Sequence, residues 1–207
     1  MFYYLTVMNE NYEHPAMPQG AEAGILKGMY LLRESKSKAK SRAQLMGSGT
    51  ILREVEAAAE LLEKDWGVAA DVWSATSFTE LRRDGLAAER WNLLHPDDKP
   101  RMPYVTQRLG KRPAGPVVAA SDYIKTFADQ IRPFVPRERA YRVLGTDGFG
   151  RSDSRAKLRH FFEVDRHFVA VAALKALAEQ GEGKAKSVAD AIKKYGIDPG
   201  KPDPTTV

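Results

Sequence analysis

Short apolar runs typical of β-strands alternate with amphipathic segments typical of helices along most of this sequence. In the clearest helical segment, "ILREVEAAAELLEKDWG", Ile51, Val55, Ala58 and Leu62 recur at helical spacing, and Gly67 can end the helix. Strands and helices alternate about four times, which is typical of a mostly parallel sheet with helices on both faces. The predicted strands are the segments 2–8, 29–35, 43–50, 68–78, 116–121 and 141–145.

Further helical segments follow with the same apolar periodicity. Ser48 or Thr50 can cap the helix after the third strand, and Ser187 can cap the last one. The proline- and charge-rich segment 97–115 is predicted to be a long connection. The stripes expected to face the core are Ile124, Phe127, Ala128 and Ile131, then Val164, Phe168, Val171 and Leu174, and finally Val188, Ala191, Ile192 and Tyr195.

Composition excludes several classes of protein. The 207 residues contain no cysteine, which removes disulfides, thiolate metal sites and cysteine nucleophiles. No apolar run approaches the ~18 residues that span a membrane, and the first residues, "MFYYLTVMNENY", lack the features of a signal peptide. We therefore expect a cytoplasmic protein without a membrane partner.

The charge of the chain leaves a binding alternative open. The net charge is +5, but 27 acidic residues are interspersed with 32 basic ones. Only "RESKSKAKSR", residues 33–42, concentrates basic side chains, and it lacks the aromatic residues that a single-strand binding surface uses. A solvated loop is the favoured interpretation. The alternative is a stand-alone basic module that binds nucleic acid or an acidic protein partner.

Two glycine-containing loops follow predicted strands. They are "GSG" at residues 47–49 and "GTDGFGRSDSR" at residues 145–155. Loops at the carboxyl ends of parallel strands can bind anions, but neither loop fits a known phosphate-binding motif. We favour tight turns in both places. Since a turn has no obvious need for Asp147 and Arg151, these two charges are expected to pair with a neighbouring domain or subunit.

No motif predicts a self-contained active site. The four histidines form neither HxxxH nor HExxH, and no serine stands in a GxSxG motif. Ser152 or Asp153 is expected to cap the helix that follows the second glycine loop. From the residues alone, the chain is an α/β domain with no catalytic residue or metal site of its own.

Several motifs together carry a resemblance to a known family. "YRVLGTDGFGRSDSR", "YYLTVMNENYEHPAMPQG", "LMGSGTILREVEAAAELL" and "PVVAASDYIKTFADQIRPFVP" resemble the C-terminal region of the homodimeric type of pyruvate dehydrogenase. The resemblance covers nearly the whole chain in the family's order. It implies a three-layer α/β/α fold similar to the C-terminal domain of transketolases.

The resemblance also implies a division of the chain and a set of partners. Residues 1–18 correspond to the last strand of a middle, pyrimidine-binding domain with its linker, and residues 19–207 to the C-terminal domain. The full-length family protein is a homodimer that works with a lipoyl acyltransferase core. With thiamine diphosphate and Mg²⁺ it converts pyruvate to acetyl-lipoyl and CO₂. The family's cofactor motif and catalytic histidines are absent here, so this chain alone is expected to bind no cofactor and to be inactive.

Two groups of residues receive roles from the resemblance. Asn9, Glu10, Asn11 and Tyr12 stand where related transketolases carry a phosphate-binding arginine, and they are expected at the rim of the substrate cavity. The second group is expected to form an interdomain or dimer loop. Its members are Gly145, Asp147, Gly148, Gly150 and Arg151.

Overall fold

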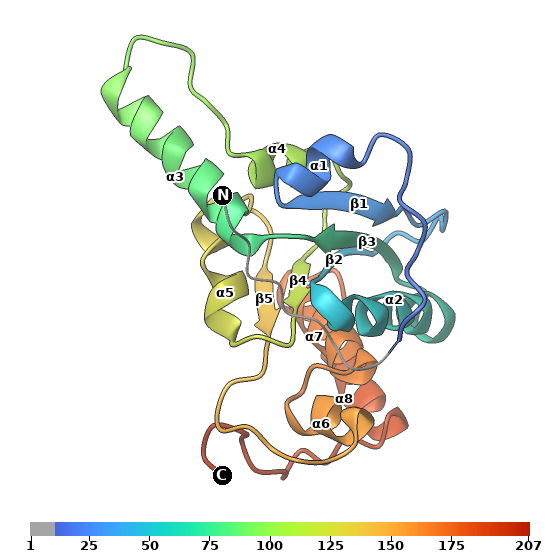
Figure 1. The fold of residues 1–207 in the computed structure, drawn as a ribbon. Coiled ribbons are helices and arrows are strands. Elements are labelled where there is room, and N and C mark those ends of the chain that lie inside the picture. The colour runs from blue at the N-terminus through green and yellow to red at the C-terminus, as the bar shows by residue number, and fades with distance from the viewer. Residues whose placement is uncertain (1–10) are drawn as a thin grey trace.

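The computed structural model describes residues 11–207, and a five-stranded sheet forms their centre (Figure 1). Its order is β1-β3-β2-β4-β5, in which β1 is antiparallel to β3 and the other neighbours are parallel. The prediction of a mostly parallel sheet is confirmed, while the predicted strand 2–8 lies outside the described residues. The strands are β1 (Met29–Arg33), β2 (Arg42–Gly47), β3 (Ala69–Ala75), β4 (Val117–Ala120) and β5 (Tyr141–Leu144).

Helices cover both faces of this sheet, which makes three layers. Side chains alternate along a strand, so Leu45 packs on one face of β2 while Met46 packs on the other. Figure 1 shows α2, α7 and α8 on one side of the sheet and α3 and α5 on the other. The helices are α1 (Glu22–Leu26), α2 (Leu52–Trp66), α3 (Phe78–Leu94), α4 (Tyr104–Gly110), α5 (Lys125–Asp129), α6 (Arg155–Phe161), α7 (Arg166–Glu179) and α8 (Ala185–Lys194).

The prediction was most accurate for α2. The residues expected to face the core, Ile51, Val55, Ala58 and Leu62, are all buried, and Gly67 ends the helix in the left-handed conformation. The expected caps were wrong. Helix α2 continues directly from a 3₁₀ turn over Gly49–Ile51, and neither Ser48 nor Thr50 caps it. A side-chain cap is unnecessary there because the turn already directs the chain into the helix.

Two segments on the second face differ from their predictions. The connection 97–115 contains α4, which begins where the Tyr104 N–H donates to Asp84 Oδ2 at 2.6 Å. The helix expected to carry the stripe from Ile124 to Ile131 is only α5, followed by a 3₁₀ turn at Arg132–Phe134. Ile124 and Phe127 are therefore exposed, at 45% and 42%, instead of facing the core. Ala128 and Ile131 are buried as expected.

The C-terminal helices begin at other residues than predicted. Asp165 caps α7 by accepting hydrogen bonds from the N–H groups of His167 and Phe168, so Val164 precedes the helix. Ser187 lies inside α8, whose N-terminal flanking residue is Lys184. Ser154, and neither Ser152 nor Asp153, flanks the start of α6. Within the described residues, no helix combines the length and hydropathy needed to cross a membrane.

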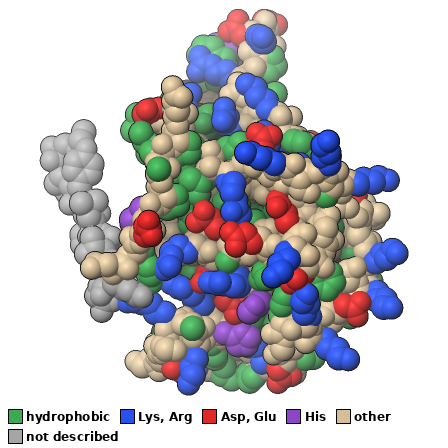
Figure 2. Space-filling model, turned by 90° about the vertical axis from the view of Figure 1, so that its right-hand side faces the viewer, with side chains coloured by type: hydrophobic (Ala, Val, Ile, Leu, Met, Phe, Trp, Pro, Cys, Tyr) green, Lys and Arg blue, Asp and Glu red, His purple; other side chains and the backbone are tan. Residues whose placement is uncertain are grey.

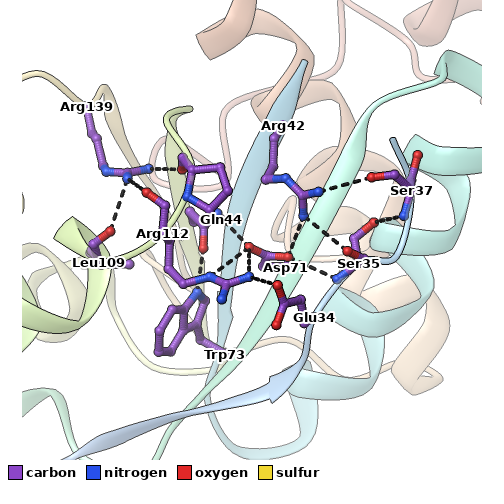
Figure 3. A network of polar contacts seen from close by, with 11 residues as sticks. Glu34, Ser35, Ser37, Arg42, Gln44, Asp71, Trp73, Leu109, Arg112 and Arg139 are labelled. Carbon is purple, nitrogen blue, oxygen red and sulfur yellow. Dashed lines mark hydrogen bonds and ion pairs between the residues drawn. The ribbon is translucent and has the colours of Figure 1, made fainter. Parts of the chain in front are cut away.

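A buried polar network stabilises the amino ends of β2 and β3 (Figure 3). At its centre the Asp71 side chain, fully buried, accepts hydrogen bonds from Gln44 Nε2 at 2.9 Å, Arg42 Nη1 at 2.7 Å and Arg112 Nη2 at 3.0 Å. The N–H of Ser35 donates to the same carboxylate at 3.0 Å. Burial alone would raise the pKa of Asp71, but the hydrogen bonds from Gln44, Ser35 and Arg112 and the charge of Arg112 outweigh it and lower the pKa.

Candidate functional site

The candidate site is the carboxyl edge of the sheet, where the loops after β2, β4 and β5 meet. A cavity of about 320 Å³ opens there, which we call the carboxyl-edge cavity. Open α/β sheets place ligands and contacts at this edge. Its lining consists of Thr50, Ile51, Asp122, Thr146, Gly148, Gly150, Arg151, Arg155, Leu158, Arg159, Phe162 and Val164.

The loop after β5 is clamped to the loop after β4. Thr146 donates its N–H to Tyr123 O at 2.9 Å and its hydroxyl to Asp122 O at 2.7 Å. Asp147 accepts a hydrogen bond from the N–H of Lys125 at 3.0 Å, and its carboxylate lies 3.4 Å from Lys125 Nζ. The turn therefore does use Asp147, contrary to the sequence expectation. A further role of Asp147 toward another domain stays a prediction.

The three glycines of this loop differ in how much space their surroundings would leave for a Cβ atom. A Cβ on Gly145 would lie 2.6 Å from Tyr123 O, so the approach of the two loops requires its absence. Gly148 has a φ of +98°, and a Cβ there would collide with Pro204 O of the C-terminal tail. A Cβ on Gly150 would meet nothing within 4 Å. The packing of this domain therefore requires glycine at positions 145 and 148 but leaves room for a side chain at position 150.

The tip of the loop, residues 149–151, carries two exposed side chains. Phe149 is 79% exposed, although it follows a glycine that is tightly packed. Arg151 is also exposed, and its guanidinium lies 5.6 Å from the centre of the Phe161 ring. Sequence reasoning singled out Arg151 but missed Phe149. An apolar aromatic residue between two glycines of a surface loop was the available signal.

Tyr12 contacts three arginines from α2 and α6, which we call the arginine cluster: Arg53, Arg155 and Arg159. Its hydroxyl accepts hydrogen bonds from Arg155 Nη1 at 3.2 Å and from Arg159 Nη2 at 3.3 Å. The Arg53 guanidinium lies 4.3 Å from the centre of the Tyr12 ring, within range of a cation–π contact. The segment before α1 is thereby attached to the carboxyl edge.

The buried Glu54 on α2 binds one arginine of this cluster and a further arginine on α7. Glu54 accepts hydrogen bonds from Arg159 Nη1 at 3.1 Å and from Arg166 Nε at 2.9 Å. Burial would raise the pKa of Glu54, but the hydrogen bonds and charge of Arg166, together with the charge of Arg159, lower it. Glu54 stays ionised and fixes the orientation of Arg159 toward Tyr12.

The expected rim residues lie only partly in the described structure. Asn9 and Glu10 fall outside the described residues, and Asn11 is exposed. Tyr12 is half-buried, with its hydroxyl directed into the arginine cluster. The structure therefore brings Tyr12 and the loop with Arg151 to the same edge of the sheet, a proximity that the sequence did not predict.

The "GSG" turn at the carboxyl edge is poorly suited to bind a diphosphate. Gly49, in the "GSG" turn, is close to the Asp122 carboxylate, since a Cβ there would lie 3.2 Å from Oδ1. Thr50 donates its hydroxyl to the same carboxylate at 3.3 Å. A fixed negative charge thus occupies the place where a cradle would receive an anion. The described residues contain no group of three or more histidine and acidic side chains that could hold a metal ion.

Comparison with known proteins confirms the predicted resemblance. Over 204 residues the chain is 65% identical to the pyruvate dehydrogenase E1 component of Pseudomonas aeruginosa, covering 99% of this chain and 23% of that protein. It is 58% identical to the pyruvate dehydrogenase E1 component of Escherichia coli K12, covering 99% of this chain and 22% of that protein. The chain thus spans less than a quarter of the length of these curated relatives.

Solved structures and a family model describe the same fold. The transketolase from Leishmania mexicana matches with a TM-score of 0.50 at 19% identity, over 79% of this chain and 20% of that chain. This likeness supports the three-layer arrangement that the sequence predicted. The model of the transketolase-like TK C-terminal domain matches residues 28–165, which is more than half of the chain. The chain therefore belongs to the family of transketolase-like C-terminal domains, and its similar curated relatives are pyruvate dehydrogenase E1 components.

Proposed function

We propose that this chain is the C-terminal domain of a pyruvate dehydrogenase E1 component and that it assembles the enzyme without carrying its catalytic residues. The identity of 65% over nearly the whole chain supports the assignment to this enzyme. The Asp122 carboxylate beside the "GSG" turn disfavours a diphosphate at that turn, which supports a cofactor site in another domain. In this proposal thiamine diphosphate and Mg²⁺ bind to other domains of a homodimer, as the family resemblance implies.

In this proposal the full-length enzyme converts pyruvate to acetyl-lipoyl and CO₂ in the cytoplasm. It works there with a lipoyl acyltransferase core. Thiamine diphosphate supplies the carbanion chemistry when bound. This chain contributes the attachment of Tyr12 to the carboxyl edge of its sheet, because the arginine cluster holds Tyr12 in place. In this proposal Asn9, Glu10, Asn11 and Tyr12 belong to the rim of the substrate cavity, as the family resemblance implies.

One observation carries the assembly role: Phe149 is 79% exposed at the tip of a loop whose base is clamped. Aromatic and arginine side chains are enriched in the central parts of protein interfaces, and Phe149 and Arg151 lie two residues apart. A fixed base lowers the entropy that the tip would lose on binding. We infer that residues 149–151 contact a neighbouring domain or the second subunit.

A chimera tests the assignment to the enzyme. In the E1 component of Pseudomonas aeruginosa, the region that matches this chain is replaced by this chain, and pyruvate-dependent acetylation of lipoyl groups is measured. We expect the chimera to keep activity within about tenfold of its parent, because most surface positions tolerate change. A folded, dimeric chimera that binds thiamine diphosphate but has no activity would contradict the proposal.

A further inference from the structure

A row of three lysines lies at the opposite edge of the sheet from the carboxyl-edge cavity. Lys36, Lys38 and Lys40 are exposed, while the residues between and beside them turn inward to different degrees. We call this row the lysine ridge. It lies in the segment between β1 and β2, within the only strongly basic run of the sequence.

Hydrogen bonds on its inner side hold the ridge in one conformation. Ser35 Oγ accepts the N–H of Ser37 at 3.1 Å, and Ser37 Oγ accepts the N–H of Ala39 at 3.2 Å. Arg42 donates to the carbonyl oxygens of Ser35 and Ser37 while it pairs with Asp71 (Figure 3). These hydrogen bonds are partly buried and attach the segment to the amino ends of β2 and β3. The lysines are thus presented by a pre-organised backbone.

The three lysines of the ridge carry positive charges that the described residues leave unpaired. Within the described part of the chain, the ammonium groups of Lys36, Lys38 and Lys40 have no ion-pair partner, and their backbone N–H groups have no hydrogen-bond acceptor. On the face drawn in Figure 2, acidic and basic side chains are interspersed. The ridge is therefore a local basic feature, whereas the net charge of the whole surface is modest.

A groove runs beside the ridge and gives room for a ligand. Its volume is about 590 Å³, and Lys38, Lys40, Pro113 and Ala114 contribute to its wall. Glu182 is the acidic side chain that lines it, and no aromatic side chain lines it among the described residues. Single-stranded nucleic acid binds by stacking bases on aromatic rings, so this groove is poorly suited to it.

We propose that the lysine ridge binds an extended acidic segment of another protein, with aspartate or glutamate at every second position. An extended peptide presents side chains of one face at a period of two residues, which is also the period of the three lysines. The free backbone N–H groups of the ridge can accept such a segment as an added strand. This proposal does not depend on the enzyme assignment above.

Binding is tested with the 207-residue chain and two fluorescein-labelled peptides, measured by fluorescence anisotropy at low and moderate salt. In one peptide glutamate alternates with threonine, and in the other the same residues form a glutamate block and a threonine block. The third probe is an oligothymidylate with as many phosphates as the peptides have glutamates. We expect the alternating peptide to bind more tightly than both other probes and to weaken as salt rises.

Two triple variants distinguish an effect of the three ridge lysines from an effect of the net charge of the protein. Lys36→Gln, Lys38→Gln and Lys40→Gln together should weaken binding of the alternating peptide about tenfold, as three exposed ion pairs would. The control carries Lys64→Gln, Lys99→Gln and Lys193→Gln, which remove the same charge from exposed sites elsewhere and should change the affinity about twofold or less. Thermal unfolding verifies that both variants are folded.

Four results would overturn the proposal. The first is no binding of the alternating peptide at low salt. The second is an equal loss in both triple variants, since that would reflect net charge alone. The third is equal affinity for the block peptide, because the period of two would then be irrelevant. The fourth is tighter binding of the oligothymidylate through the same lysines, which would make the ridge a nucleic-acid surface.

Discussion

At the scale of single residues, Asp71 shows how a buried charge links segments that are distant in the sequence. Its carboxylate accepts hydrogen bonds from Arg42 and Gln44 on β2, from Arg112 after α4 and from the backbone of Ser35. Arg139 in turn donates to the carbonyl oxygens of residues 109, 112, 113 and 115, which positions Arg112. Removing the charge of Asp71 would leave two arginines without their shared partner.

Replacing Asp71 with asparagine is therefore expected to lower the free energy of unfolding by about 3–5 kcal/mol, because one side of a buried ion pair is lost. Urea unfolding followed by circular dichroism at pH 7 measures this change. The matched control is Asp190→Asn on the exposed face of α8, which should change the free energy by about 0.5 kcal/mol or less. A loss at Asp71 as small as that of the control would contradict the role of the network.

The lowered pKa of Asp71 also predicts a pH dependence. A group whose pKa is lower in the folded state adds stability above its unfolded pKa, about 3.9 for aspartate, and this contribution disappears as the pH falls through the folded pKa. The difference in unfolding free energy between the wild type and Asp71→Asn should be constant near neutral pH and should shrink below about pH 4. Urea unfolding curves across this pH range measure the difference in unfolding free energy. An unchanged difference down to pH 2.5, which is about 1.4 units below the unfolded pKa of aspartate, would contradict a lowered pKa of Asp71.

At the scale of elements, the loop between β5 and α6 combines a packed base with an exposed tip. Gly145→Ala should lower the free energy of unfolding by about 1–3 kcal/mol, since the new Cβ would collide with the backbone of the loop after β4. Gly150→Ala, in the same loop, should leave it unchanged or raise it by up to about 1 kcal/mol through the unfolded state. Thermal unfolding of both variants makes the comparison, and equal losses would show that the base is not tightly packed.

Helices were predicted correctly where the apolar spacing and the end signals in the sequence agreed. They were missed where contacts with distant residues determine the helix. Helix α2 has an apolar stripe and a glycine end, so its extent followed from the sequence. Helix α4 depends on Asp84, which lies on α3, accepting the first N–H of the helix, and on the burial of Val105 and Leu109. Ile124 was expected inside because its spacing matched a stripe. Its backbone is extended before α5, so the stripe does not exist there.

At the scale of the whole molecule, three parts of the chain meet at the carboxyl edge. Tyr12, the loop after β4 and the loop after β5 lie together there. In the proposed enzyme this edge faces the neighbouring domain or subunit. The lysine ridge lies at the other end of the strands, where we propose that a different partner binds.

Arg151→Ala, introduced into the chimeric E1 component, is expected to weaken dimer or domain association about tenfold, as loss of an exposed interface arginine would. Sedimentation across a range of concentrations measures the dimer dissociation constant, and limited proteolysis measures domain association. Arg137→Ala, an exposed arginine before β5 at the opposite edge, is the matched control and should leave both unchanged. Wild-type association in the Arg151 variant would remove the proposed role of the loop tip.

The sequence by itself determined the fold class, the position of each described strand and the family. These depend on hydrophobic periodicity and on ordered motifs, which are local properties of the chain. Only the tertiary structure decided that Asp147 serves the turn, that Tyr12 meets the arginine cluster and that Asp71 connects four segments. Such contacts join residues far apart in the sequence, and the energy of a buried or paired charge depends on neighbours that no local pattern specifies. Likewise, the basic run 33–42 was visible in the sequence, but the hydrogen bonds that support its backbone were not.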